Sequence, residues 1–277
     1  MSTSSILSIE DLTVEFKTKS GTVPLVRNVN LKVKTGSWLG VVGESGSGKS
    51  ILALSILRLL PPRASILSGH VFYQDIDLLQ SSEADMQEIR GREISVIFQN
   101  ALSALNPLFT AGDQIADVYR FHHGASRKES QQKVVELLGA LGLTDPETTA
   151  KRYPHQLSGG MAQRVMIAMA LISSPRLLIA DDPTSTLDAT IQAQVLDILV
   201  NQVCQRNMSM LLISRDIRLV SALCTEIAVM RAGEILEAGP VGEILSKPTH
   251  PYTRQLLADV ELDAPQTFSK GWLERCP

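Results

Sequence analysis

A glycine-rich segment at residues 43–50 has the composition and spacing of a loop that binds phosphate. It reads Gly43-Glu44-Ser45-Gly46-Ser47-Gly48-Lys49-Ser50. Glycines let backbone N–H groups turn inward toward phosphate oxygens. In this pattern Lys49 would reach the β and γ phosphates, and the Ser50 hydroxyl would bind Mg²⁺. The segment therefore predicts a binding site for a nucleoside triphosphate with its magnesium ion.

The residues on either side predict the elements that must position this loop. Trp38–Val42 is a short apolar run that predicts a strand, and Ser50–Leu60 has helical periodicity that stops at Pro61-Pro62. The alternative is an ordinary glycine-rich surface loop. Because a phosphate loop requires a strand before it and a helix after it, the context favours phosphate binding.

A second chemical feature is a pair of carboxylates at the end of an apolar run. Leu177–Ala180 predicts a buried strand, and Asp181 and Asp182 follow it directly. Ligands of open α/β sheets bind at the carboxyl ends of strands. Asp181 could hold Mg²⁺ there, and Asp182 could polarise an attacking water. The alternative is a plain turn at Asp-Asp-Pro.

The remaining pattern predicts an α/β fold. Apolar runs at 177–180 and 210–214, separated by a helix at 191–203, predict a parallel sheet covered by helices. Further expected elements are alternating strands at 6–16 and 23–33, strands at 69–73 and 94–98, mostly helices and loops over 100–155 with a clear helix at 131–141, a helix at 159–173, a hairpin at 227–238, and a polar, irregular end from about Asp259.

Composition excludes some classes of protein. The chain has 277 residues, 44% of them hydrophobic, which suffices for one large domain with a core or a main domain plus a small appendage. A net charge of −3 gives no basic excess for a nucleic-acid partner. No apolar run approaches the roughly 18–20 residues that span a bilayer. We therefore expect a cytoplasmic chain whose role at a membrane would need partner proteins.

A third motif resembles that of a known family. Leu157-Ser158-Gly159-Gly160-Met161-Ala162-Gln163-Arg164 resembles the signature sequence of ABC ATPases. The phosphate loop, Gln99, this signature, the acidic strand and residues 185–188 occur in the family's order. The resemblance covers roughly residues 5–260. It implies a P-loop NTPase fold of the ABC ATPase type, with a RecA-like core, an antiparallel β subdomain and a helical subdomain.

The resemblance also implies boundaries and a subfamily. It implies a nucleotide-binding domain at 1–258, with its helical subdomain at about 100–173, and a short tail at 259–277. The chain resembles ATP-binding subunits of peptide and nickel importers at residues 97–100, 105–107 and 161–171 and at His250-Pro251-Tyr252-Thr253. Related subunits often have a cysteine-rich tail that can hold an iron–sulfur cluster, but the single thiolate of Cys276 cannot hold a cluster that needs about four, so we expect none.

Within the family, ATP and Mg²⁺ lie between two chains, and the resemblance assigns roles accordingly. Phe16 would stack on adenine, unless it is simply a strand core residue. Gln99 would contact Mg²⁺ or the attacking water and sense the membrane partner. Ser158, Gly159 and Gly160 begin a helix, which is an anion site, and would face the γ-phosphate held by the opposite chain. Asp188 would couple the two ATP sites that form between the two chains.

The implied partners are a second ABC ATPase subunit of a different chain, two transmembrane permease subunits and, indirectly, a solute-binding protein. The implied location is peripheral, on the cytoplasmic face of a bacterial or archaeal plasma membrane. Peptides are the expected cargo, with nickel or a metal chelate as the alternative. An alternative of another class is a non-transport ABC ATPase. The signature argues against a P-loop kinase or GTPase.

Two positions depart from the family pattern. Asp182 stands where most members have Glu, so its carboxylate would lie about 1 Å further from the water, a misplacement that can lower a rate about a hundredfold. Arg215 stands where the family usually has His, and it cannot act as a neutral acceptor near pH 7. Our hypothesis is that the chain binds ATP but hydrolyses it slowly at its own site. One alternative is that both residues are tolerated and both sites hydrolyse ATP, and another is that a substitution was introduced on purpose to trap ATP.

Overall fold

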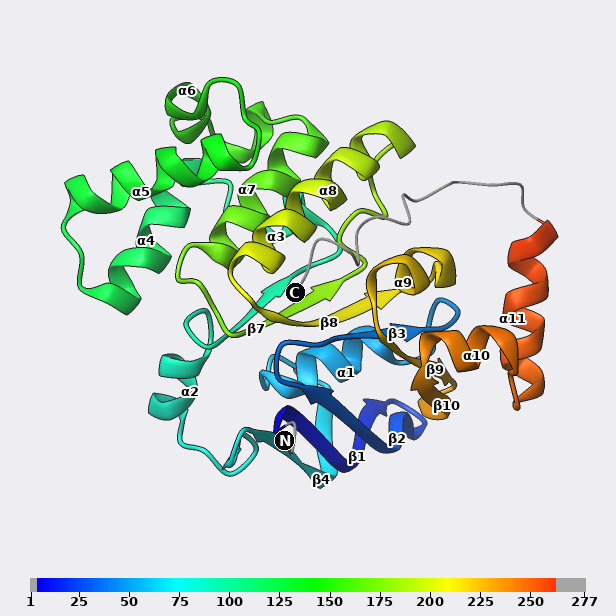
Figure 1. The fold of residues 1–277 in the computed structure, drawn as a ribbon. Helices are drawn as coiled ribbons and strands as arrows, with labels where there is room; N and C mark the ends of the chain where they lie inside the picture. The colour runs from blue at the N-terminus through cyan, green and yellow to red at the C-terminus, as the bar shows by residue number, and fades with distance from the viewer. Residues whose placement is uncertain (1–3, 263–277) are drawn as a thin grey trace. The chain divides into compact units, whose positions relative to one another are not determined.

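The computed structural model describes residues 4–262, and the contacts of the chain divide it into two compact units (Figure 1). Among the described residues, the first unit comprises 4–87 and 209–262, and the second comprises 88–208. Cys276 and most of the predicted tail lie outside the described residues. Within residues 4–262, none of the helices has both the length and the apolar character needed to cross a bilayer.

The first unit contains an antiparallel sheet with the order β2-β1-β4-β5. Its strands are β1 (Ser5–Thr18), β2 (Gly21–Lys34), β4 (Ala64–Tyr73) and β5 (Ile76–Asp77). Alternate residues such as Leu7 and Ile9 are fully buried, because successive side chains of a strand point to opposite faces. The alternation in the sequence therefore predicted β1 and β2 correctly, although both are longer than expected.

A second set of strands in the first unit has the order β10-β9-β3-β8. Strand β3 (Trp38–Val42) pairs in parallel with β8 (Ser209–Ser214) and with β9 (Glu226–Arg231), and β9 forms an antiparallel hairpin with β10 (Glu234–Pro240). Every residue of β3 and β8 is buried. The predicted parallel strands and hairpin are confirmed.

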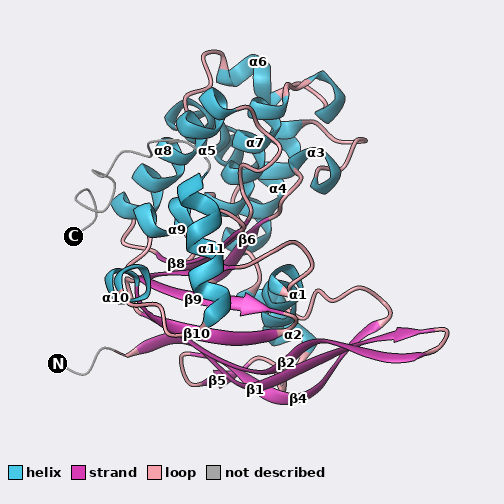
Figure 2. Cartoon of the chain, turned by 90° about the vertical axis from the view of Figure 1, so that its right-hand side faces the viewer, coloured by secondary structure: helices cyan, strands magenta, loops and turns pink. Residues whose placement is uncertain are grey.

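Two helices of the first unit differ from the sequence prediction. Helix α1 (Lys49–Ile56) ends about four residues before the expected end, because Arg58 has a left-handed φ of 54° that breaks the helical path. Helix α11 (Pro251–Leu262) continues through the residues after Asp259 that we expected to be irregular. Helices α9 (Ile217–Leu223) and α10 (Val241–Ser246) complete this unit, and α11 packs against α9 (Figure 2).

The second unit holds the parallel pair β6 (Ile94–Ile97) and β7 (Leu177–Asp181) together with most of the helices. These helices are α3 (Ala101–Ala104), α4 (Ala111–His123), α5 (Arg127–Ala140), α6 (Pro146–Ala150), α7 (Gly159–Leu171) and α8 (Ala189–Gln205). Helix α7 packs against β6 and contacts α3, α4, α5 and α8. Helix α2 (Glu83–Ile89) spans the boundary between the units in the sequence. The predicted helices in this region are confirmed.

Candidate nucleotide-binding site

The phosphate loop has the predicted context. Buried strand β3 leads directly into Gly43, and α1 begins at Lys49. Gly48 precedes the helix with a φ of 105°, and Gly46 has a φ of 78°. Residues with a side chain rarely adopt these angles, so glycine is required for the chain to turn here. The positive end of the α1 helix dipole lies at this point of the loop, where it would attract an anion.

The loop is tightly packed against neighbouring backbone. A Cβ atom at Gly43 would lie 2.0 Å from the carbonyl oxygen of Met230 in β9, and one at Gly48 would lie 2.4 Å from that of Leu25 in β2. Neither oxygen belongs to a side chain that could move aside. Glycine at positions 43 and 48 is therefore explained by the space available as well as by phosphate binding.

Lys49 is the charged centre of the loop. Its side chain is buried, with only 6% of the residue exposed. Its ammonium group donates to the carbonyl oxygens of Gly43 and Glu44, both at 2.7 Å, and to the Ser47 hydroxyl at 2.9 Å. The loop thus holds a positive charge within its own curve, where an anionic phosphate group would be attracted.

Contacts from distant residues hold the outer side of the loop. Gly233, between β9 and β10, donates its N–H to the Ser47 carbonyl at 2.9 Å, and its own carbonyl accepts from Arg27 at 2.8 Å. The N–H of Glu44 donates to the Tyr252 hydroxyl at 3.2 Å. Our sequence analysis assigned Gly233 to a hairpin and Tyr252 to a segment that resembles importer subunits, but it did not predict that either residue supports the loop.

Arg215 lies at the same sheet edge as the loop. In the parallel register of β3 and β8, Val42 is opposite Ser214, so Gly43 and Arg215 follow at neighbouring strand ends. Arg215 is exposed. Asp216 then begins α9 by accepting from the N–H of Arg218 at 2.9 Å. The first unit therefore brings together two of the sequence-predicted features, the phosphate loop and Arg215.

Phe16, the predicted adenine contact, lies near the end of β1. It pairs with Val23 of β2 and Ala64 of β4. Its side chain is half-buried, so it is not a fully enclosed core residue and keeps an accessible part. This partial exposure is compatible with stacking on a base.

In the second unit, the strand register places Gln99 beside the pair Asp181 and Asp182. Ile97 is opposite Ala180 in the parallel pair, so Asp181 is the last residue of β7 and Gln99 lies just beyond the end of β6. The Gln99 side-chain nitrogen donates to the Ser185 hydroxyl at 3.3 Å, and this hydroxyl donates to the Asp182 carbonyl at 3.1 Å. Ser185 thus connects Gln99 to the backbone of Asp182, a role that the sequence pattern did not indicate.

The two aspartates at the end of β7 have different environments. Asp181 is buried, with 9% of the residue exposed, whereas Asp182 is half-buried and has a left-handed φ of 47°. Buried carboxylates in proteins are normally paired or bind a cation. The Asp181 carboxylate and the Gln99 amide oxygen are hard oxygen donors of the kind that Mg²⁺ prefers.

The signature segment forms the predicted helix start. The Ser158 hydroxyl accepts from the N–H of Met161 at 3.3 Å at the beginning of α7, and Asp188 accepts from the N–H of Ile191 at 3.0 Å at the beginning of α8. A Cβ atom at Gly160 would lie only 2.7 Å from a methyl carbon of Ile191. The second unit therefore brings the beginnings of α7 and α8 close together, with Ser158 and Asp188 as their capping residues.

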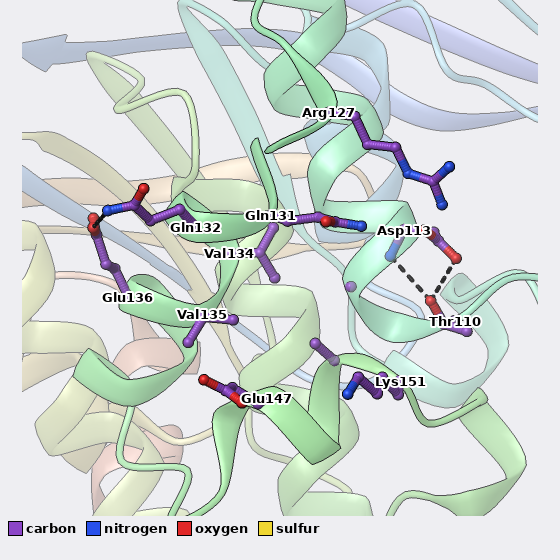
Figure 3. Close-up of a pocket in the computed structure, with 12 residues that line it drawn as sticks. Thr110, Asp113, Arg127, Gln131, Gln132, Val134, Val135, Glu136, Glu147 and Lys151 are labelled. Atoms are coloured by element: carbon purple, nitrogen blue, oxygen red, sulfur yellow. Dashed lines mark hydrogen bonds between the residues drawn. The ribbon is translucent and has the colours of Figure 1, made fainter. Parts of the chain in front are cut away.

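A separate cavity of about 620 Å³ lies in the second unit, among α4, α5 and α6 (Figure 3). Its lining is of mixed charge and includes Asp113, Arg127, Glu147 and Lys151. Asp113 accepts from the Thr110 hydroxyl at 2.7 Å. The lining contains none of the residues that the sequence predicts to bind nucleotide or metal.

Comparisons with known proteins agree with this geometry. The family model described as ABC transporter matches residues 26–185. A probable peptide ABC transporter ATP-binding protein of Sinorhizobium fredii is 44% identical over 256 residues, which are 92% of this chain and 76% of that protein. A putative peptide import ATP-binding protein of Brucella melitensis is 43% identical over 260 residues, 94% of this chain and 78% of that protein.

Solved structures support the same assignment. A dimeric ATP-binding cassette in a post-hydrolysis state with ADP and phosphate has a TM-score of 0.76 at 27% identity, over 85% of this chain and 98% of that one. A component of an ABC transporter complex from Clostridium perfringens shares the fold, with a TM-score of 0.72 at 22% identity, over 95% of this chain and 96% of that one. The chain belongs to the ABC transporter family and is one of its ATP-binding, ATP-hydrolysing subunits.

Proposed function

We propose that this chain powers a peptide importer, by binding ATP and closing as a dimer on membrane partners. The observation that carries the proposal is the phosphate loop, in which buried Lys49 is held by loop oxygens at the carboxyl end of β3. The assignment to peptides is supported by the names of the relatives from Sinorhizobium fredii and Brucella melitensis, which describe a peptide transporter and a peptide importer. Residues 1–258 would act as the nucleotide-binding domain, with residues 100–173 as its helical subdomain.

In this proposal the loop residues 43–50 bind the ATP phosphates. Backbone N–H groups at the start of α1 would contact phosphate oxygens, and Lys49 would exchange its loop oxygens for the β and γ phosphates. Phe16 would stack on adenine. Ser50, Gln99 and Asp181 would hold Mg²⁺, which neutralises phosphate charge when bound.

Residues 158–160 would complete the site of a second chain. The beginning of α7 carries the positive end of a helix dipole together with exposed Ser158, and it would contact the γ-phosphate held by that chain. Asp188, at the beginning of α8, would couple the two sites across this interface. The dimeric arrangement of the similar cassette solved with ADP and phosphate supports this proposal.

The proposed partners follow from this role, because the chain binds ATP and other subunits would have to move the cargo across the membrane. Two transmembrane permease subunits would carry the cargo, and a solute-binding protein would deliver it. The chain would bind the permeases peripherally, on the cytoplasmic face of the membrane. A second ATPase subunit with an intact hydrolytic site would pair with this chain. Residues 158–160 keep the Ser-Gly-Gly sequence that would contact the γ-phosphate bound by that subunit.

Hydrolysis at this chain's own loop would be slow. Asp182 has one methylene fewer than glutamate, which withdraws its carboxylate by about 1 Å from an attacking water. Its left-handed backbone and the hydrogen bonds that its carbonyl accepts from Ser185 restrict how far the chain could move to compensate. Arg215, beside Gly43 at the sheet edge, could stabilise bound ATP but could not accept a proton from water near pH 7.

The test is reconstitution of the chain in lipid vesicles together with two permease subunits and a second ATPase subunit encoded by neighbouring genes. We expect ATP-dependent uptake of peptide, and loss of uptake when Lys49→Ala is introduced into this chain. Uptake of Ni²⁺ but not of peptide would overturn the assignment of cargo. Full peptide uptake with Lys49→Ala in this chain would overturn the proposal that its loop powers transport.

A further inference from the structure

The beginning of α11 reaches the phosphate loop, although 208 residues separate the two positions in the sequence. The Tyr252 hydroxyl accepts a hydrogen bond from the N–H of Glu44 at 3.2 Å. Tyr252 is buried, with 3% of the residue exposed, and the guanidinium of Arg231 lies 4.5 Å from the centre of its ring. The ring is thus held by burial and by a cation–π contact, while its hydroxyl is directed at the loop.

The Glu44 residue is consequently held at both of its backbone polar groups. Its N–H donates to Tyr252, and its carbonyl accepts from the Lys49 ammonium at 2.7 Å. A backbone N–H that donates to tyrosine is not turned toward a phosphate. Tyr252 therefore fixes the orientation of the first residue after Gly43, from which the remaining loop residues continue toward Lys49.

Tyr252 is itself positioned by Glu237 of β10. The Glu237 carboxylate accepts from the N–H and hydroxyl of Thr249, at 2.7 and 2.8 Å, and from the N–H of His250 at 3.1 Å. The ring nitrogen Nδ1 of His250 then accepts from the N–H of Tyr252 at 3.1 Å. One carboxylate thus fixes the turn that begins α11, and the turn fixes the tyrosine.

The ionisation of Glu237 agrees with this role. Its partial burial would raise its pKa, but the hydrogen bonds that it accepts from Thr249 and His250 outweigh burial and lower the pKa to about 2. The carboxylate is therefore charged, and a strong acceptor, throughout the physiological range.

We propose that Tyr252 is a positioning residue for the phosphate-binding loop. Its hydroxyl holds the Glu44 peptide so that the loop is already shaped for ATP, and Glu237 holds Tyr252 in place. The inference rests on the proposed role of residues 43–50 in binding ATP. It gives the His-Pro-Tyr-Thr segment, residues 250–253, a function in nucleotide affinity, so that a change in this segment would alter the ATP site.

The first test is Tyr252→Phe, which removes the hydroxyl but keeps the ring and its contact with Arg231. Loss of the hydrogen bond between the Tyr252 hydroxyl and the Glu44 N–H predicts about a fivefold weaker Kd for ATP. Hydrogen exchange at the Glu44 amide should become faster by a similar factor of about five. The unfolding midpoint of the ATP-free chain should fall by no more than roughly 2–4 °C, the effect of one lost hydrogen bond, because the buried ring remains.

Two further variants separate positioning from general stability. Tyr119→Phe removes a hydroxyl in the second unit, where Tyr119 stacks on His123, and it should leave the ATP Kd unchanged. Glu237→Gln weakens the hydrogen bonds that hold Thr249 at the turn before α11. It should therefore raise the ATP Kd, as Tyr252→Phe does. In the double variant with Tyr252→Phe the two effects should not add, because both act through one contact.

The outcomes are distinguishable. If the wild-type chain does not bind ATP, the proposed function fails. If the wild-type chain binds ATP, and Tyr252→Phe leaves both the Kd and the Glu44 exchange rate within twofold of wild type, the positioning role is wrong. A faster Glu44 exchange rate with an unchanged Kd would also overturn it, because the contact would then exist without serving ATP binding.

Discussion

The substitution Gly43→Ala tests whether close packing shapes the phosphate loop. A Cβ atom at this position would lie 2.0 Å from the carbonyl oxygen of Met230, and Met230 is buried within β9. Real contacts of this kind begin near roughly 3.0 Å, so loop and strand would have to separate by about 1 Å. The obstacle is backbone in a hydrogen-bonded hairpin, and we therefore expect the loop to move.

The size of the effect follows from this displacement. Overpacking of a well-packed site destabilises by about 1–3 kcal/mol, which in a domain of this size lowers the unfolding midpoint by roughly 2–4 °C for each kcal/mol. A 1 Å shift of binding groups can lower activity on the order of a hundredfold. We expect Gly43→Ala to lower the midpoint of the ATP-free chain by several degrees and to weaken ATP binding at least about tenfold.

Two other glycines provide controls, one in the phosphate loop and one in α10. The assays are thermal unfolding and titration with ATP. Gly46→Ala has nothing within 4 Å of the new Cβ, and only its φ of 78° adds strain of about 1–2 kcal/mol. Gly242→Ala, in α10, meets neither an obstacle nor a positive φ, and should be neutral or slightly stabilising. If the Gly43→Ala variant has the same unfolding midpoint and the same ATP affinity as the Gly242→Ala variant, the packing argument is refuted.

Three further predictions concern the helix starts and the anchor of α11. Gly160→Ala should lower the unfolding midpoint more than Gly159→Ala, because its new Cβ would lie 2.7 Å from Ile191, whereas the nearest atom to that of Gly159 is at 3.5 Å; equal midpoints would contradict this. Asp188→Ala should destabilise the chain by about 1 kcal/mol in urea unfolding and Asp188→Asn by less, since Asn also caps helices. The pKa of Glu237 is lowered from 4.5 to about 2, so its stabilising effect is full above pH 4.5 and declines as the pH falls toward 2. The difference in unfolding free energy between wild type and Glu237→Gln should thus be larger at pH 6 than at pH 3, and a constant difference would count against the role of the charge.

Much of the first unit followed from local patterns in the sequence. The half-exposed strands β1 and β2 alternate in polarity, and the buried strands β3 and β8 are continuous apolar runs. The glycine–lysine pattern correctly predicted a loop between a strand and a helix. These features were accessible because each depends on residues that are neighbours in the chain.

What the sequence did not predict depends on distant neighbours. The contact between Tyr252 and the Glu44 N–H, and the approach of Gly43 to Met230, join segments about 200 residues apart. The early end of α1 depends on the left-handed backbone of Arg58, which has no local signal comparable to glycine or proline. Connections of this kind arise from tertiary packing, and periodicity does not report them.

The most direct test of slow hydrolysis at this chain's own loop is the single-turnover rate with the purified chain in excess over ATP. We predict that wild type binds ATP but hydrolyses it slowly, and that the double variant Asp182→Glu, Arg215→His raises the rate, by up to about a hundredfold if the restored carboxylate reaches the water. Lys49→Ala in the double variant should abolish the gain. Rapid turnover by the wild-type chain, left unchanged by the double substitution, would contradict the proposal.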